Sequence, residues 1–233
     1  MKPMKPVLFN TEMVRANLED RKNTTRRIAN INTDIPCHGS EDHSFVWDNF
    51  AGGEVTGFVC KRCGFGVSPP RGRYPCGTSV FRPSYFPGDI LYVREAWQKY
   101  RIRKPLKAVP DDFNATQYLY RADGEVANSD HTPVKWRPSI HMPKEAARLF
   151  LRVTRVRVER LQDISADECA MEGVWPLYSG PIGGREAYYK NAFAKLWDST
   201  IKKADLPTCG WDANPWVFVI KYERISKEEA TKC

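Results

Sequence analysis

The segment 37–76 constrains the fold of this chain more than any other feature of the sequence. Glycine and proline recur through it at short intervals, at Gly52, Gly53, Gly57, Gly64, Gly66, Pro69, Pro70, Gly72 and Pro75. A segment of this size and composition buries too little apolar surface to hold a fold without a cross-link. The whole chain has 233 residues, a length that suits one domain carrying an insert. We therefore expect residues 37–76 to be inserted into a main domain made of residues 1–36 and 77–233.

Cysteines supply the cross-link that this insert needs. Cys60 and Cys63, followed by Gly64, form a knuckle that presents two thiolates to one ion. Counting Cys37 and Cys76, the four cysteines are separated by 22, 2 and 12 residues. This spacing resembles a zinc ribbon with one close pair and two single cysteines. The pattern predicts a closed, tetrahedral and structural zinc site formed by all four thiolates.

Two alternatives to this ligand set remain open. Either His38 or His43 replaces Cys37 as the fourth ligand, or the cysteines are ordinary buried thiols. A thioredoxin-like redox site is the weaker interpretation of Cys60 and Cys63, because no strand–helix unit surrounds them.

The composition argues against a membrane protein and permits a polyanionic partner. Hydrophobic residues make up 42% of the chain, enough for a core, but no apolar run reaches the roughly 18 residues of a spanning helix. No apolar leader follows the basic residues 1–6, so we expect a cytoplasmic protein. In that compartment the seven cysteines favour metal ligation or free thiols over disulfides. The net charge of +8 is compatible with a nucleotide, RNA or DNA as partner.

The basic segment 21–27, with the sequence RKNTTRR, carries unusual chemistry for a loop. A lysine that is desolvated or crowded by other cations gives up its proton more readily, which makes Lys22 a candidate base. A hydroxyl beside such a base is a candidate nucleophile, a role that Thr25 suits. The paired guanidinium groups of Arg26 and Arg27 suit a phosphate group. The alternative is a solvated basic end of a helix.

Periodicity and capping signals predict alternating strands and short helices. The turn at 87–89, Pro-Gly-Asp, precedes a strand. Ser165 with Glu168 forms a capping box that begins a helix. The strand over 147–158 changes the parity of its apolar residues midway, which predicts a bulge. The expected strands cover 7–9, 90–93, 147–158 and 216–225, and the expected helices follow Asn10 or Thr11 and cover 165–173 and 186–197.

Charged residues stand out at two places in these elements. Glu172 lies in the last turn of the helix over 165–173, where a carboxylate opposes the helix dipole unless a cation lies nearby. The alternative for Glu172 is a solvated surface position. The strand over 147–158 and its exit form either a basic stripe or an edge strand protected by charge, through Arg148, Arg152, Arg155, Arg157 and Arg160.

The order of these elements and their motifs resembles the ASCH domain, the activating-signal-cointegrator homology family. Residues 7–35 and 86–225 carry the resemblance, through Asp20-Arg21-Lys22…Thr25…Arg27, Pro87-Gly88-Asp89 and Gln162-Asp163-Ile164-Ser165…Glu172. The chain is most similar to the longer ASCH-like proteins of phages and prophages, which implies a location in the cytoplasm of a bacterial host cell. The resemblance also implies an α+β fold, a PUA-like mixed β-barrel flanked by short helices, with the zinc-ribbon-like segment inserted.

The best-understood small bacterial relatives in this family are amidohydrolases that remove the acetyl group from acetylated cytidine. Their motif implies Lys22 as the catalytic lysine, Thr25 as the nucleophile and Glu172 as the catalytic glutamate. Arg26 or Arg27 would then hold a substrate phosphate or help to stabilise the oxyanion. The resemblance thus predicts hydrolysis of a modified cytidine-type nucleoside or nucleotide.

Other features keep further functions open. This chain has Asp20 and Asn23 where the family motif Gly-Arg-Lys-Thr has glycine and threonine. Other ASCH proteins resemble RNA-binding modules or ribonucleases, so a non-catalytic RNA- or DNA-binding module and a ribonuclease are the alternatives. Further candidates for contact with substrate or nucleic acid lie at the exit of the strand over 90–93, namely Arg94, Glu95 and Trp97.

Overall fold

The computed structural model describes residues 3–29, 45–50, 55–60, 66–67, 83–101, 116–124, 135–174, 179–181 and 184–232. Of the strands at 45–50, 55–60 and 66–67 it describes the backbone alone. The chain separates into two compact units. Unit 1 contains Met1–Asp20, Ile90–Leu151 and Arg224–Cys233, and unit 2 contains Arg21–Asp89 and Arg152–Glu223.

Unit 2 is built on strands that pair in the order β2-β10-β9-β3-β4-β5. β2 (Thr24–Ile28) runs antiparallel to β10 (Trp216–Ile225), with Thr25 opposite Ile220. β9 (Phe150–Arg160) pairs with β10 and, antiparallel, with β3 (Phe45–Phe50). β4 (Val55–Cys60) and β5 (Gly66–Val67) continue antiparallel from β3. The segment expected as a basic loop therefore becomes a strand from Thr24 onwards.

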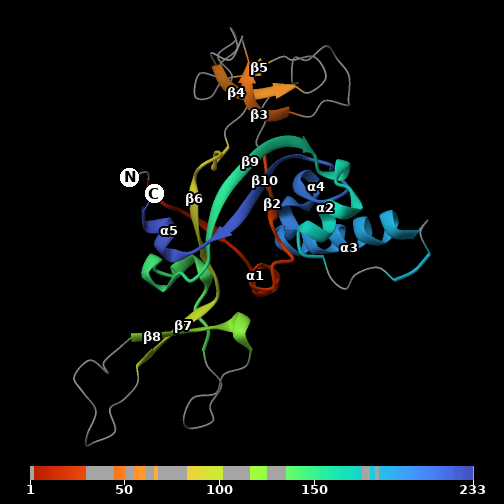
Figure 1. The fold of residues 1–233 in the computed structure, drawn as a ribbon. Coiled ribbons are helices and arrows are strands. Elements are labelled where there is room, and N and C mark those ends of the chain that lie inside the picture. Colours follow the sequence, from red (N-terminus) through yellow and green to blue (C-terminus); the bar gives the residue numbers. More distant parts are fainter. Residues whose placement is uncertain are drawn as a thin grey trace, which may run out of the picture. The chain divides into compact units, whose positions relative to one another are not determined.

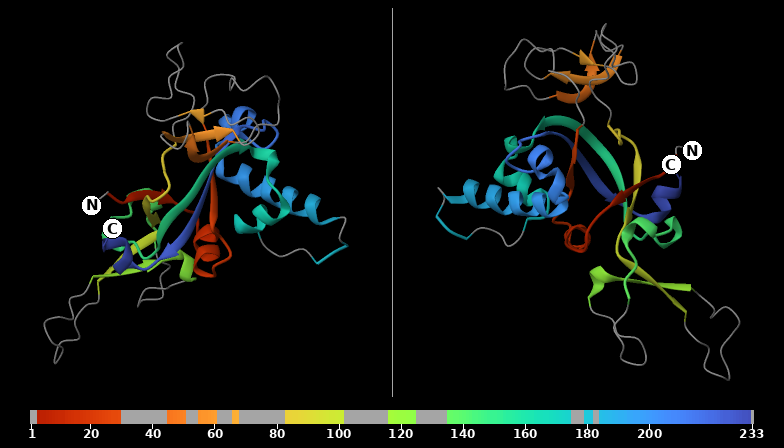
Figure 2. Two further views of the ribbon diagram at one scale, coloured as in Figure 1. Left: turned by 45° about the horizontal axis from the view of Figure 1, so that its top comes forward. Right: turned by 180° about the vertical axis from the view of Figure 1, so that it is seen from behind.

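Helices cover one face of the β2–β10 pair. In Figure 1 and in both views of Figure 2, α2 (Ala166–Met171), α3 (Arg185–Thr200) and α4 (Leu206–Cys209) lie on the same side of these strands. The predicted capping box begins α2, because Ser165 and Glu168 each accept a hydrogen bond from the other's backbone. The helix ends before Gly173, whose φ of 92° is the left-handed conformation that favours glycine.

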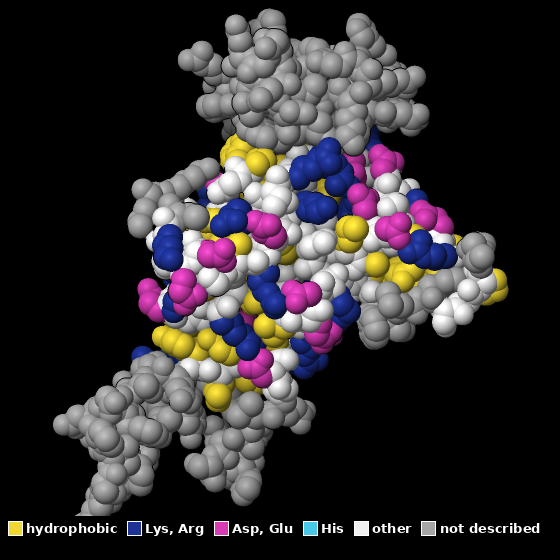
Figure 3. Space-filling model, in the orientation of Figure 1, with side chains coloured by type: hydrophobic (Ala, Val, Ile, Leu, Met, Phe, Trp, Pro, Cys, Tyr) yellow, Lys and Arg dark blue, Asp and Glu magenta, His cyan; other side chains and the backbone are white. Residues whose placement is uncertain are grey.

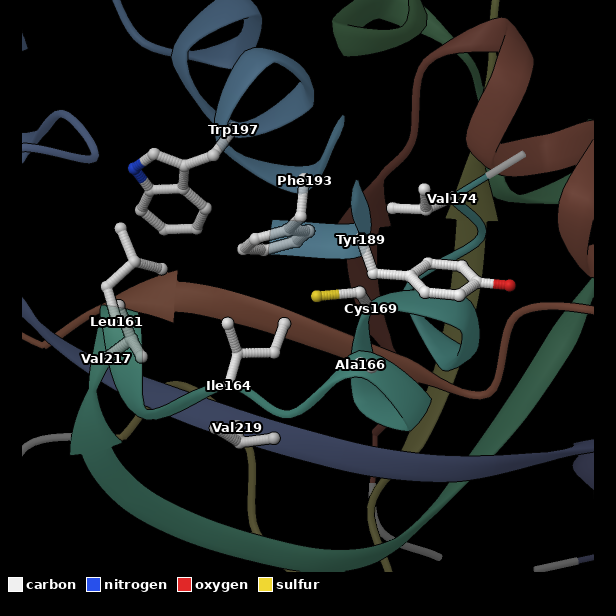
Figure 4. Close-up of a cluster of buried hydrophobic side chains, with 10 residues drawn as sticks. All are labelled: Leu161, Ile164, Ala166, Cys169, Val174, Tyr189, Phe193, Trp197, Val217 and Val219. Carbon is white, nitrogen blue, oxygen red and sulfur yellow. The ribbon is translucent and has the colours of Figure 1, made fainter. Parts of the chain in front are cut away.

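The core of unit 2 lies between these helices and the strands. Figure 4 shows Tyr189, Phe193 and Trp197 of α3 reaching toward Val217 and Val219 of β10. The remaining buried members come from the segment that leads into α2, from α2 itself and from the residues just after it, namely Leu161, Ile164, Ala166, Cys169 and Val174. This core fixes α2 against the sheet, and α2 carries Glu172 at its C-terminal end.

Unit 1 is built on the parallel pair of β1 (Lys5–Leu8) and β6 (Ile90–Arg94). The N–H of Val93 in β6 donates to the Leu149 carbonyl. β7 (Trp97–Arg101) pairs antiparallel with β8 (Thr116–Tyr120). Asn10 caps α1 (Thr11–Leu18), and α5 (Lys227–Lys232) follows β10. Across both units, short 3-10 helices cover Arg121–Asp123, Ser139–His141, Lys144–Ala146, Leu161–Asp163 and Lys203–Asp205.

The structure confirms the expected mixed α+β class. The last strand occupies Trp216–Ile225 as predicted, and in β9 the consecutive residues Thr154 and Arg155 are both exposed where the apolar parity changes. Among the described residues, the strand pairings within neither unit close into a barrel. No described helix is long and apolar enough to cross a membrane.

Candidate functional site

The loop between α1 and β2 brings Lys22 to the C-terminal end of α2. Asp20 begins this turn with φ 56°, the glycine-favoured conformation, at the position where the family motif has glycine. The N–H of Asn23 donates to the Met171 carbonyl at 3.0 Å, and Lys22 Nζ donates to the Glu172 carbonyl at 2.9 Å. Because the last carbonyls of a helix have no partner inside it, these two bonds complete the end of α2.

Lys22 and Glu172 form a fully buried ion pair. Lys22 Nζ lies 2.6 Å from Glu172 Oε2, and the two side chains are 0% and 4% exposed. The cation that a carboxylate requires at this end of a helix is therefore Lys22. The ammonium binds both the backbone carbonyl and the carboxylate of the same residue, which fixes its position.

Arg26 on β2 brings three carboxylates to the same place. Its Nη1 donates to Glu172 Oε1 at 3.0 Å, and its Nη2 donates to Glu159 Oε1 at 2.6 Å and to Glu168 Oε2 at 3.0 Å. Arg157 on β9 donates to the other oxygens of Glu159 and Glu168. We name this cluster of three cations and three carboxylates the Glu172 network: Lys22, Arg26, Arg157, Glu159, Glu168 and Glu172.

The surroundings shift the pKa values of both members of the central pair. Burial lowers the pKa of Lys22, and the charges of Arg27 and Arg26 add to this effect while Glu172 opposes it. Burial alone would raise the pKa of Glu172, but Lys22 and Arg26 outweigh it and lower that pKa. The carboxylate is thus held ionised beside an amine with a weakened hold on its proton. Such an amine can serve as a general base.

Thr25 is buried in β2, next to Arg26. Successive side chains of a strand point to opposite faces, so Thr25 shares a face with Arg27. In the part of the chain that the structure describes, the Thr25 hydroxyl makes no hydrogen bond to Lys22 or Glu172. The structure brings together the amine and the carboxylate of the predicted triad, and the hydroxyl is close to the amine in sequence without bonding it.

Arg94, Glu95 and Trp97, predicted to contact substrate, all belong to unit 1. Arg94 Nε donates to the Met142 carbonyl at 2.8 Å. Glu95 is buried, and its two oxygens accept hydrogen bonds from Arg148 at 2.9 and 3.0 Å. Trp97 is 4% exposed and packs in the core of this unit. All three side chains take part in the internal packing of unit 1.

The predicted arginine stripe is largely neutralised by internal partners. Arg152 pairs with Glu223 at 2.9 Å, and the Arg160 guanidinium lies 4.5 Å from the centre of the Trp216 ring. Two further members bind carboxylates, as described above, and Arg155 is exposed. β9 is paired on both sides, so it is not an edge strand. On the face shown in Figure 3, basic side chains lie among acidic ones, and the stripe does not favour a nucleic-acid surface.

The predicted zinc ligands fall outside this description. Cys37, Cys63 and Cys76 lie outside the described residues, and Cys60 ends β4, of which only the backbone is described. The alternative ligands at 38 and 43 also lie outside it. Within the described ranges, no group of three or more His, Cys, Asp or Glu side chains is arranged to hold a metal ion. The zinc site therefore stays a prediction.

Sequence reasoning missed the outer members of the Glu172 network, although the sequence contained signals for them. Glu168 and Glu172 are four residues apart on a helix, where two like charges repel each other unless cations lie between them. Arg157 and Glu159 are two residues apart on a strand and therefore share a face. The local signals assign Glu168 to a helix cap and Arg157 to the stripe, and in the structure each has a further partner in the network.

Comparisons with models of protein families, with curated proteins and with solved structures found no match to this chain. The ASCH resemblance and the PUA-like fold consequently stay predictions that rest on the motifs. The geometry of the Glu172 network is the independent basis for a functional argument.

Proposed function

We propose that the chain is an amidohydrolase that removes an acyl group from a modified cytidine-type nucleoside or nucleotide, with Lys22, Thr25 and Glu172 as its catalytic groups. The observation that carries the proposal is the buried ion pair between Lys22 and Glu172, which are 150 residues apart in sequence. A lysine with a lowered pKa beside an ionised carboxylate is the base that such a hydroxyl nucleophile needs. The substrate class comes from the ASCH resemblance.

The reaction proceeds in two halves. Neutral Lys22 accepts the proton of the Thr25 hydroxyl, whose oxygen attacks the amide carbonyl of the acylated base. The carbon–nitrogen bond then breaks, and the leaving amine takes the proton from Lys22 while Glu172 holds the ammonium in position. Water, deprotonated by the same lysine, hydrolyses the resulting ester of Thr25. The carboxylic acid leaves, and both catalytic side chains are restored.

The test is hydrolysis of acetylcytidine and related acylated nucleosides, with release of cytidine and acetate as the readout. Lys22→Ala and Thr25→Ala should each lower kcat/KM on the order of 10²–10⁴-fold, the range that loss of a general base costs. Lys195→Ala, at an exposed position on α3 in the same unit, is the matched control and should leave the rate unchanged. Circular dichroism shows whether each variant is folded.

Three outcomes would reject the proposal. Turnover that is unchanged in both folded variants would exclude the triad. A protein that turns over no acylated nucleoside but binds RNA or DNA, with an affinity that falls steeply as salt rises, would be a nucleic-acid-binding module instead. Cleavage of RNA in the same assay would identify the ribonuclease.

The proposed fold is the PUA-like ASCH barrel with a structural zinc in the segment 37–76. Metal analysis of the purified protein should find about one zinc per chain. Cys60→Ser should lower the zinc content and destabilise the insert, because metal binding supplies its folding free energy. A metal-free protein whose Cys60→Ser variant unfolds like the parent would contradict this assignment.

A further inference from the structure

Carboxylates of the protein bind both terminal nitrogens of the Arg26 guanidinium, and its Nε is buried. Both of its terminal nitrogens donate to carboxylates, at 2.6 Å to Glu159 and at 3.0 Å to Glu168 and Glu172. The Cζ atom of Arg26 lies 5.8 Å from the centre of the Phe193 ring, and the Arg26 side chain is 1% exposed. A phosphate group could reach Arg26 only by displacing carboxylates from a buried site, where an unpaired charge is costly.

We propose that Arg26 is a positioning residue that orients Glu172 toward Lys22, and not a phosphate anchor. This inference rests on the proposed function, because it assigns Arg26 a role in the Lys22 and Glu172 site. Arg26 Nη1 holds one carboxylate oxygen of Glu172 at 3.0 Å, which leaves the other oxygen 2.6 Å from Lys22 Nζ. Glu159 and Glu168 hold the second nitrogen of Arg26 in turn.

Sharing the carboxylate between two cations also affects the lysine. The charged groups that act most strongly on Lys22 include Glu172 at the end of α2 and Arg26 and Arg27 from β2. A carboxylate that binds Arg26 as well attracts the ammonium of Lys22 less than an unshared carboxylate would, and Arg26 itself repels that ammonium. Removing Arg26 strengthens the attraction between Glu172 and the ammonium and removes the repulsion by the guanidinium. Both changes raise the pKa of Lys22, which then keeps its proton to a higher pH.

The first experiment compares Arg26→Gln with the parent on acetylcytidine and on its 5′-monophosphate. The rate of the parent rises with pH as Lys22 loses its proton. In Arg26→Gln this rising limb of the pH profile should move up by about one pH unit. At pH values where Lys22 is mostly protonated, kcat should therefore fall roughly tenfold for both substrates. KM should change equally for the two substrates. A KM that rises for the monophosphate alone, with the limb unmoved, would make Arg26 the phosphate anchor and overturn the proposal.

Two further variants separate positioning from general damage. Arg26→Lys keeps the charge but not the planar fork, so it can hold only one carboxylate well; it should fold and recover part of kcat, with a limb between those of the parent and Arg26→Gln. Arg185→Gln removes an exposed guanidinium that pairs with Asp167 on the same unit and should leave the limb unmoved. A limb in Arg26→Lys at the parent position would contradict the role of the fork.

The second experiment does not need turnover. The ¹³Cε signal of Lys22, assigned by its absence from Lys22→Met, is titrated in the parent and in Arg26→Gln. A higher pKa of Lys22 in the variant supports the role of Arg26, and an unchanged pKa overturns it. A protein without hydrolase activity whose Lys22 pKa still responds to Arg26 would reject the proposed function alone, so the two failures are distinguishable.

Discussion

Each unit buries a glutamate against an arginine, and the pKa values of the two glutamates are shifted in opposite directions. In unit 2, Glu172 binds Lys22 and Arg26, and its pKa is lowered although burial alone would raise it. In unit 1, Glu95 binds Arg148 through both oxygens, yet burial still raises its pKa, with Asp123 adding to the rise. Both carboxylates are nearly inaccessible to solvent.

The difference teaches that the number of cations around a buried carboxylate decides the direction in which its pKa moves. Glu172 binds two cations, Lys22 and Arg26. Arg26 also binds the two other carboxylates of the Glu172 network, in which three positive groups balance three negative ones. Glu95 shares its single arginine with Asp123, to which Arg148 Nη1 also donates at 2.7 Å. A bidentate arginine alone therefore does not compensate desolvation, and the added lysine makes unit 2 the candidate site.

Removal of the carboxylate charge should have the largest effect in unit 2. Glu172→Gln leaves the ammonium of Lys22 buried without its counter-charge, which should lower the free energy of unfolding by about 3–5 kcal/mol. Glu95→Gln leaves Arg148 one-quarter exposed and still paired with Asp123, so its cost should be about 1–2 kcal/mol. Urea denaturation at pH 7 measures both values.

Glu228→Gln, at an exposed position on α5, serves as the control and should change the free energy of unfolding by less than about 0.5 kcal/mol. Equal costs at positions 95 and 172 would break the comparison, because the second cation would then have no measurable consequence.

The pH dependence of stability should separate the two glutamates by sign. The folded-state pKa of Glu172 lies below the ordinary value of 4.5, so its stabilisation is present above pH 4.5 and is lost as pH falls through the folded-state value. The folded-state pKa of Glu95 lies above 4.5. The folded state consequently gains stability from Glu95 as pH falls through that raised value toward 4.5.

Denaturation of the parent and both glutamine variants between pH 7 and about pH 2 tests these signs, because the contribution of Glu172 is lost only below pH 4.5. The stability gap between the parent and Glu172→Gln should narrow on acidification, whereas the gap between the parent and Glu95→Gln should shift in favour of the parent. Parallel gaps for the two variants would show that the two buried carboxylates share one environment, contrary to the contacts observed.

Local signals in the sequence were sufficient for much of unit 2. The capping box at Ser165, the final strand and the change of parity in β9 depend on neighbours within a few residues, and each was predicted. The basic segment was expected to be a loop because its side chains are charged, yet Thr24–Ile28 forms a strand. Its pairing with β10, almost 200 residues away, overrides the local preference.

The site was predictable only in part, for a physical reason. Glu172 at a helix end required a cation, and Lys22 supplies it. The direction of Arg26 depends on which face of β2 the helices cover, and this is fixed by tertiary pairing that no local pattern encodes. The sequence therefore predicts that Arg26 is available to bind a phosphate group, whereas in the fold it binds three carboxylates.

The smallest expected effect compares the two capping boxes. Ser165 and Glu168 cap α2, and Ser226 and Glu229 exchange the same pair of hydrogen bonds ahead of α5. Removing either serine hydroxyl, in Ser165→Ala or Ser226→Ala, should cost about 1 kcal/mol, the usual value of an N-cap. The two caps differ because Glu168 also accepts hydrogen bonds from Arg26 and Arg157.

Double-mutant cycles with Arg26→Gln should expose this difference. Ser165→Ala frees Glu168 to move, which alters the carboxylate that Arg26 holds, so the two changes should couple by about 0.5 kcal/mol or more. Ser226 shares no partner with Arg26 among the described contacts, so that pair should be additive within about 0.3–0.5 kcal/mol. Additivity in the Ser165 cycle would mean that Glu168 only caps its helix, and the Glu172 network would then end at Arg26.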